Sequence, residues 1–266
     1  MQRFPHNAGG MKITFLGTGT SIGVPVIGCA CAVCHSTNPK NRRRRSSVHV
    51  EAEGLHIQID TPPDFREQVL EYGVPRVDAV LITHAHADHV FGFDDLRRFN
   101  TIQGAVIPVY SSASTIEELR RIFAYAFRPV PPGMYRPQVT LNAVDAPFLV
   151  GKVRVTPVPV QHGDAIMFGY RLDGDGRSLG YVPDCVSMTS AAVAAFSGVD
   201  LMVLDALRHT PHASHAHVES SLAMLKKIGP RRSFLTHMCH DIDHDAVQAK
   251  MPPAVELAWD GLVVEV

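Results

Sequence analysis

The stretch that most constrains the fold is an apolar run that ends abruptly in a cluster of histidines. Val77 to Ile82 is apolar and rich in β-branched residues, which predicts a buried strand. The next residues read H-x-H-x-D-H and supply His84, His86, Asp88 and His89. Past the end of a strand, side chains at i and i+2 point the same way, so the first two histidines can bind one cation. The aspartate and the third histidine follow one turn later, where a predicted helix begins, and can serve a second cation.

Three other strand-like runs downstream each end in a residue type that binds metals. These residues are His162, Asp184 and His237. Together with the H-x-H-x-D-H segment they resemble, in order, the ligand set of the metallo-β-lactamase superfamily, and the resemblance runs from Met11 to the C-terminus. It implies two divalent metal ions, zinc or manganese, and hydrolysis by a hydroxide that the two ions share.

The resemblance also assigns each ligand to an ion. One ion would be held by His84, His86 and His162, and the other by Asp88, His89 and His237, with Asp184 bridging the two. A carboxylate bridge fits physically, because two cations about 3.5–4 Å apart repel each other and need an anion between them. Asp60 matches the superfamily's first motif, in which an aspartate supports the metal-binding loop through hydrogen bonds.

Composition and the order of elements predict one large domain. The chain has 266 residues, of which 45% are hydrophobic, and this is enough to bury a full core. Each half of the chain begins with strands and ends with helices. This order fits an α/β (α+β) fold, a four-layer αββα sandwich in which two sheets face each other with helices outside. We expect the domain to span 11–266 and residues 1–10, which are polar and end in glycine, to form a disordered tail.

Helices are expected at 64–72, 91–99, 115–127, 189–196 and 218–228. A proline-rich segment at 128–137 cannot be regular structure, because proline removes backbone donors and fixes φ. Long loops are usually either functional or disordered. We therefore expect this segment to be a lid beside the site or a plain surface loop, and in the first case Tyr135 and Arg136 are candidate substrate contacts.

Cysteines predict a second kind of metal site. Cys29, Cys31 and Cys34 lie in a loop rich in glycine and proline, and three thiolates with one further ligand form a tetrahedral structural zinc site. The fourth ligand is expected to be His240, with Cys239 as the competing candidate; the alternative is three free thiols. A cysteine trio with a histidine just after the last active-site histidine resembles the phosphodiesterases of the carbon–phosphorus lyase pathway, which hydrolyse phosphoribosyl cyclic phosphate.

Four consecutive arginines, at 42–45, allow two interpretations. A run of like charge is usually a solvated surface. Alternatively, one or two of these side chains turn inward and bind phosphate oxygens in bidentate fashion, which makes Arg44 and Arg45 candidate substrate contacts.

A histidine-rich segment before the 218–228 helix supplies a candidate general acid. His215 is our choice, because the segment resembles the superfamily's phosphodiesterase branch, which carries a catalytic histidine just before the helix that leads to the last ligand. Histidine suits proton transfer because its unperturbed pKa of about 6.5 lies near the working pH. His212 and His217 are the alternatives. The remaining histidines are expected to be surface or core residues: His6, His35, His49, His56, His209 and His244.

These features predict a dinuclear metal-dependent hydrolase, most readily a phosphodiesterase acting on small cyclic phosphates or nucleotides, with Asp184 and His215 as catalytic residues. The alternatives are a transfer-RNA 3′-processing endonuclease and a thioester or lactone hydrolase. A non-enzymatic alternative is a zinc-knuckle RNA-binding module. Lys and Arg number 25 against 26 Asp and Glu, so no global basic field favours general nucleic-acid binding.

Cysteine usage and hydropathy give the expected compartment. Five cysteines do not form an even disulfide set, and no apolar run approaches the roughly 20 residues of a membrane span. We expect a cytoplasmic protein with no signal peptide and no membrane partner. The oligomeric state is left open and is compatible with a homodimer.

Overall fold

The computed structural model describes residues 10–129 and 135–266. The expected N-terminal tail, apart from Gly10, and the centre of the proline-rich loop lie outside the described residues, so neither expectation is tested by the structure.

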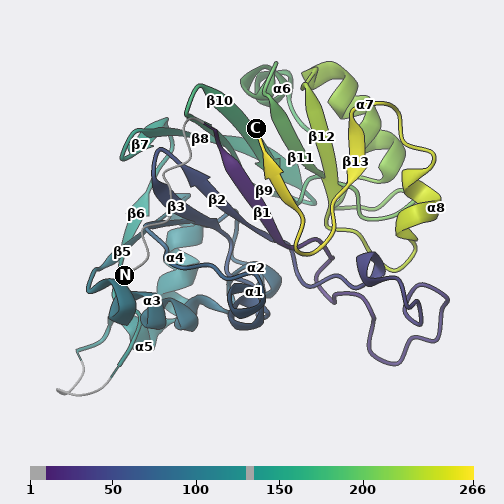
Figure 1. Cartoon of the computed structure of the whole chain (residues 1–266). Coiled ribbons are helices and arrows are strands. Elements are labelled where there is room, and N and C mark those ends of the chain that lie inside the picture. Colours follow the sequence, from purple (N-terminus) through teal and green to yellow (C-terminus); the bar gives the residue numbers. More distant parts are fainter. Residues whose placement is uncertain (1–9, 130–134) are drawn as a thin grey trace.

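The first of two sheets is built almost entirely from the N-terminal half of the chain. Its strands lie in the order β14-β1-β2-β3-β4-β5-β6. They are β1 (Lys12–Gly17), β2 (Ser47–Ala52), β3 (Leu55–Ile59), β4 (Ala79–Leu81), β5 (Ile107–Ser111), β6 (Val139–Ala143) and β14 (Val263–Glu265). Strand β14 pairs antiparallel with β1, so the C-terminal end of the chain completes the edge of the N-terminal sheet (Figure 1).

The second sheet contains the remaining strands, in the order β13-β12-β11-β10-β9-β8-β7. They are β7 (Phe148–Val150), β8 (Val153–His162), β9 (Ala165–Gly174), β10 (Arg177–Val182), β11 (Leu201–Asp205), β12 (Arg232–Thr236) and β13 (Val255–Leu257). Strands β10 to β13 are parallel, whereas β7 to β10 pair antiparallel.

A continuous apolar core separates the two sheets. It combines Phe15, Val50 and Ile57 of the first sheet with residues such as Tyr170 and Phe234 of the second, all of them buried. Along β2 the core-facing residues alternate with Ser47, His49 and Glu51, as the period of two of a strand requires. Burial of this apolar area is the main stabilising contribution to the pairing of the sheets.

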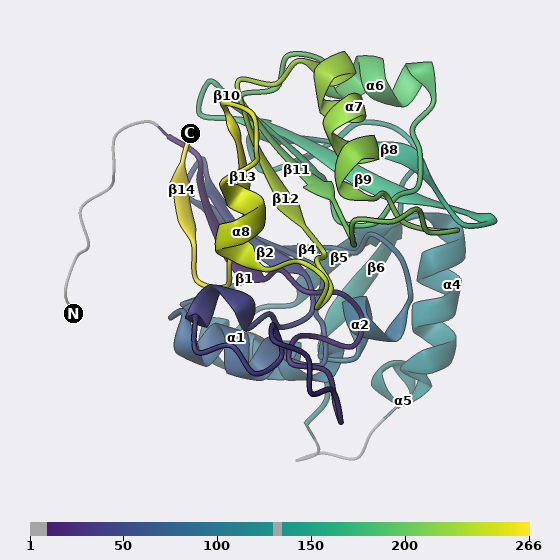
Figure 2. The same cartoon turned by 90° about the vertical axis from the view of Figure 1, so that its right-hand side faces the viewer.

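Helices cover the outer face of each sheet. The helices α1 (Phe65–Glu71), α2 (Ala87–Val90), α3 (Leu96–Gln103), α4 (Ala113–Ile122) and α5 (Ala124–Phe127) belong to the first half, and α6 (Ser190–Phe196), α7 (Val218–Ile228) and α8 (His244–Gln248) to the second. Phe65 and Leu119 pack in one outer cluster, and Phe196 and Leu225 in the other. Figures 1 and 2 show the two helical groups on opposite sides of the paired sheets, which confirms the predicted αββα sandwich.

Two of the predicted helices are interrupted. The expected helix at 91–99 is divided at Gly92, where the backbone passes so close to Pro62 and Phe65 that a Cβ would collide with both. A short 3₁₀ turn at Phe93–Asp95 then precedes α3. The expected helix at 115–127 breaks at Phe123, whose buried ring stacks on Phe93 at a centroid distance of 4.8 Å.

Across the part of the chain that the structure describes, none of the helices has the length and apolar character needed to cross a bilayer.

Candidate metal centre and active site

The H-x-H-x-D-H segment begins three residues after β4 and runs into α2. His84 and His86 point the same way, as expected, and their facing nitrogens Nε2 and Nδ1 are 2.9 Å apart. His162, the last residue of β8, completes a group of three whose ligand atoms all lie within 4.8 Å of one another. Three imidazoles from two different sheets therefore meet at one point, and this is the first ion's expected ligand set.

Asp184 lies between this group and a second one. Its Oδ1 is 3.4 Å from His89 Nε2 and 3.3 Å from His237 Nε2, whereas its Oδ2 is 3.9 Å from His84 Nε2. Asp88, His89 and His237 form a group with the spacing of metal ligands. The two carboxylate oxygens thus face different histidine groups, which is the arrangement of a bridging ligand.

Several atoms in this cluster are buried and yet find no hydrogen-bond partner among the described residues. They are His89 Nε2, His237 Nε2, His237 Nδ1, His162 Nδ1 and Asp184 Oδ1. Unpaired buried polar atoms cost about 1–3 kcal/mol each, so such a concentration requires compensation. Imidazole nitrogens and carboxylate oxygens are ligands for borderline divalent ions, and the residues present therefore fit two such ions.

Charge in the cluster also favours cations. Burial alone would lower the pKa of His89, but the carboxylates of Asp184, Asp88 and Asp60 together raise it well above its usual value. Burial alone would raise the pKa of Asp184, but the adjacent His237 and His89 hold it well below its usual value. Asp184 therefore remains ionised and stabilises positive charge at the centre of the cluster.

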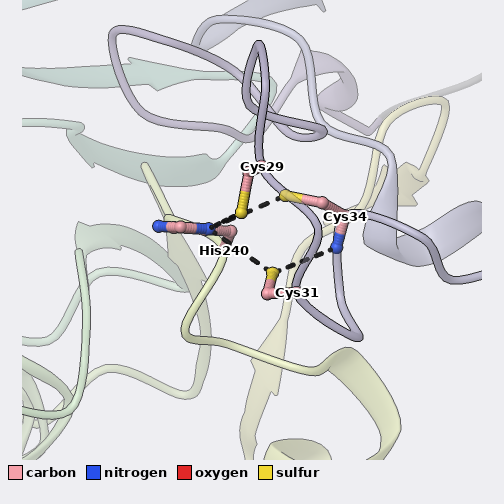
Figure 3. Close-up of side chains that lie close together, drawn as sticks. All are labelled: Cys29, Cys31, Cys34 and His240. Carbon is pink, nitrogen blue, oxygen red and sulfur yellow. Dashed lines mark hydrogen bonds between the residues drawn. The ribbon is translucent and has the colours of Figure 1, made fainter.

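The loop between β1 and β2 carries the cysteine trio, and Figure 3 shows how its side chains converge on His240. Distances from His240 Nδ1 to the sulfur atoms of Cys29, Cys31 and Cys34 are 3.2, 3.5 and 3.6 Å. A hydrogen bond from the Cys34 backbone N–H lowers the pKa of Cys31 to about 6. Three sulfurs and one imidazole nitrogen around a common point fit tetrahedral zinc.

Comparison with known proteins agrees with this geometry. A family model described as the beta-lactamase superfamily domain matches residues 56–238, which include all of strands β4 to β12 and all seven expected ligands. The chain belongs to the metallo-β-lactamase superfamily. It is a metal-dependent hydrolase with the α+β fold of that superfamily.

Three proteins illustrate the range of similarity. A crystal structure of a diphosphatase from the PhnP family has 38% identity and a TM-score of 0.89, with 97% of each chain covered. Zinc-bound PqqB from Methylobacterium extorquens has 20% identity and a TM-score of 0.75, with 96% of this chain and all of PqqB covered, and it shows the fold alone. An octanoyltransferase of Porphyromonas gingivalis is 32% identical over 95% of this chain, but the chain spans only 51% of that protein's length.

The superfamily's first-motif aspartate occupies the expected position. Asp60 Oδ2 is 2.8 Å from His89 Nδ1, and Asp60 Oδ1 accepts a hydrogen bond of 2.8 Å from the Thr83 backbone N–H. Asp60 and the expected ligand His237 both have positive φ, at 60° and 59°, a conformation that costs a non-glycine residue of order 1–3 kcal/mol. Strain at both positions is typical of a site whose side chains are held in fixed directions.

One residue that contacts the candidate site was not predicted from the sequence. Asp205, the last residue of β11, is fully buried, and its Oδ2 accepts hydrogen bonds from His215 Nδ1 at 2.8 Å and from the Cys185 backbone N–H at 3.0 Å. Its position directly after the apolar run Leu201 to Leu204, ten residues before His215, was the available signal. The ring of His215 packs against those of His162 and His237, with centroids 4.6 and 4.7 Å away.

The arginine run divides into different roles. Arg43 turns inward, but it donates to the backbone carbonyls of Cys239 and Ile242, on either side of His240. Arg44 pairs with Glu71 at 2.6 Å and Arg45 with Asp64 at 3.0 Å. Contact with a substrate phosphate would require either side chain to leave its carboxylate, so their predicted role stays a prediction.

The remaining predictions concern Tyr135, the fourth ligand of the cysteine site and the alternative to His215. Tyr135 is 78% exposed, and its predicted substrate contact is untested. Of the two candidates for the fourth ligand of the cysteine site, Cys239 lies outside the group of four side chains and His240 lies within it. His212, an alternative to His215, bonds to Ser214 through Nδ1, and its ring centroid is 5.3 Å from that of His215.

Proposed function

We propose that this protein is a dinuclear metal-dependent phosphodiesterase acting on small cyclic phosphates or nucleotides. The observation that carries the proposal is the position of Asp184, whose two oxygens face two separate histidine groups. When bound, two divalent ions supply Lewis acidity, which lowers the pKa of water and offsets negative charge on phosphate oxygens. The first would be held by His84, His86 and His162, and the second by Asp88, His89 and His237.

The chain's own residues provide the proton transfer. Asp205 Oδ2 accepts a hydrogen bond from Nδ1–H of His215, so the neutral ring has one defined tautomer. Nε2 is then the nitrogen that is available for proton transfer. Burial lowers the pKa of His215 below its usual value, which makes its protonated form a stronger acid. His215 would donate the proton that the leaving alkoxide needs, and Asp205 is a positioning residue that orients it.

A phosphoryl substrate is also supported by similarity. The protein of the PhnP family that is 38% identical to this chain, over nearly the whole of both chains, is described as a diphosphatase. The cysteine group with His240 adds to this support, because the phosphodiesterases of the carbon–phosphorus lyase pathway resemble this chain there. We propose that the third metal of the chain is a structural zinc ion in this group.

The alternatives lack comparable support. A transfer-RNA endonuclease needs a basic docking surface, but the chain has a formal net charge of −1, and Arg44 and Arg45 are paired with acids. A thioester hydrolase would share the metal ligands and differs only in its substrate.

Substrate comparison tests the proposal. The purified full-length protein, supplied with Mn²⁺ or Zn²⁺, is assayed with bis(p-nitrophenyl) phosphate, a nucleoside 2′,3′-cyclic phosphate and an acyl thioester. We expect hydrolysis of both phosphodiesters and none in the Asp184→Asn variant. Asp173→Asn is the matched control and should retain activity. Asp173 lies on β9 at the far end from Ala165, the residue that pairs with His162. Hydrolysis of the thioester alone would overturn the proposal.

A further inference from the structure

A third group of potential ligands lies on the outer face of the first sheet, away from both sites described above. His49 and Glu51 are on β2, and His56 is on β3. In the register of the two strands Glu51 pairs with His56 and His49 pairs with Gln58, so the two histidines are diagonal neighbours. On this face Cβ atoms of diagonal pairs come within reach of long side chains.

The amide of Gln58 determines which nitrogen of His49 is free. Gln58 Nε2 donates to Ser47 Oγ at 2.6 Å and to the Asp60 carbonyl at 2.8 Å, so Gln58 Oε1 is the atom that faces His49. This oxygen lies 3.3 Å from His49 Nδ1 and can only accept a hydrogen bond. His49 therefore carries its proton on Nδ1, and the lone pair of Nε2 points at His56 Nδ1, 3.0 Å away.

A carboxylate completes the group. Glu51 contributes an oxygen, and the ligand atoms of Glu51, His49 and His56 all lie within 4.8 Å of one another. Glu51 Oε1 is bound by Lys12 Nζ at 2.6 Å, but both side chains are partly exposed, at 39% for Lys12 and 34% for Glu51. The ammonium group of Lys12 therefore occupies a position beside Glu51 where a metal ion could bind, and the side chain is flexible enough to leave it.

We propose that His49, Glu51 and His56 bind one further divalent cation of the borderline class, such as Zn²⁺. Two imidazole nitrogens and one carboxylate oxygen are ligands that suit this class. Binding requires Lys12 to leave Glu51, and it requires the proton of His56 to move through solvent from Nδ1 to Nε2, so that both facing nitrogens present lone pairs. The second interaction of His49, from Nδ1–H to Gln58, would fix the orientation of a ligand ring.

Protonation does not compete strongly with the cation. Burial, followed by the neighbouring His56, lowers the pKa of His49 to about 4, and burial also lowers the pKa of His56. Both rings are therefore neutral at pH 7, as metal binding demands. No residue of this group belongs to the seven-ligand centre or to the cysteine site, so the proposed site can be removed without touching either.

Zinc binding to variants of the full-length protein tests the proposal. Wild-type protein is dialysed to equilibrium against increasing Zn²⁺, and bound zinc is counted by mass spectrometry. We expect His56→Asn and Glu51→Gln to bind one zinc ion per chain fewer than wild type at saturation. Their hydrolysis of bis(p-nitrophenyl) phosphate should be unchanged, which separates this proposal from the proposed function.

The Lys12→Ala variant is expected to bind the additional zinc ion more tightly than wild type. Removal of the competing ammonium should leave the saturating count unchanged and lower the zinc concentration at which the last ion binds. Since Lys12 is half-exposed at the start of β1, this variant should fold. Equal zinc counts in wild type and His56→Asn, or weaker binding in Lys12→Ala, would overturn the proposal.

Discussion

Asp205 Oδ2 and His215 Nδ1 are 2.8 Å apart, and Asp205 is fully buried. The same oxygen accepts the Cys185 and Ala216 backbone N–H groups, at 3.0 and 3.3 Å. Because three donors hold this carboxylate, its direction is determined by the fold. The orientation and tautomer of His215 follow from it, and so does the availability of Nε2 for proton transfer.

His215→Ala should lower turnover of bis(p-nitrophenyl) phosphate by about 10²–10⁴-fold, because general acid catalysis contributes rate enhancements of this size. Metal content should remain that of wild type, since His215 is not an expected ligand. His212→Ala is the matched control and should retain near-normal turnover. A larger loss in His212→Ala than in His215→Ala would assign the proton transfer to His212.

Asp205→Asn should lower kcat by less than His215→Ala does, because an amide oxygen can still accept the Nδ1–H hydrogen bond while the negative charge is lost. Loss of this charge destabilises the protonated ring and lowers the pKa of His215, so the high-pH limb of the kcat profile, where the general acid loses its proton, should shift to lower pH. Asp205→Ala, which cannot accept the bond, should lose more activity. Equal profiles in all three proteins would show that Asp205 supports the fold without acting on His215.

Replacement of one cysteine in the β1–β2 loop should remove one metal ion. Cys31→Ser is expected to lower the zinc content by one ion per chain and to lower the melting temperature, because a structural metal contributes its binding energy to folding. Cys239→Ser is the matched control, since Cys239 lies outside the group around His240. The structural site would be refuted by an unchanged zinc content in Cys31→Ser.

Stability should depend on pH through His49. The pKa of its side chain is lowered to about 4 in the folded protein, mainly by burial, against 6.5 when it is unshifted. The folded state then binds fewer protons than the unfolded state between these values, so this contribution is fully present above pH 6.5 and is lost as the pH falls to 4. At 1.36 kcal/mol per unit the loss is at most about 3 kcal/mol.

Urea unfolding of wild type and His49→Gln, in buffer without added zinc, measures this effect. The free energy of unfolding of wild type minus that of the variant should decrease from pH 7 to pH 4. A difference that does not vary with pH would contradict the assignment.

Much of the fold was predictable from the sequence, because long amphipathic elements carry their own signal. The range of α7 (Val218–Ile228) coincides with the predicted helix at 218–228. The short edge strands β7, β13 and β14 were missed, as was α8. Strand β14 is stabilised by pairing with β1, some 250 residues earlier in the chain, and its three residues carry no local pattern that indicates such a partner.

Some residues of the site were likewise predictable from the sequence and others were not. The histidines that follow strand ends at the spacing of metal ligands were recognisable from the sequence, since few structures other than metal sites need this spacing. Four identical arginines in a row give no indication of which one is buried, and in the structure the buried one is Arg43, which donates to two backbone carbonyls. His49 and His56, interpreted as isolated core or surface residues, are brought together only by the register of β2 and β3.

Anomalous diffraction at the zinc absorption edge, from crystals grown with Zn²⁺, tests the central claim most directly. We expect two peaks about 3.5–4 Å apart, with the Asp184 carboxylate between them. One peak should lie among His84, His86 and His162, and the other among Asp88, His89 and His237. A single peak, or no peak, at this cluster in zinc-saturated crystals would contradict the account.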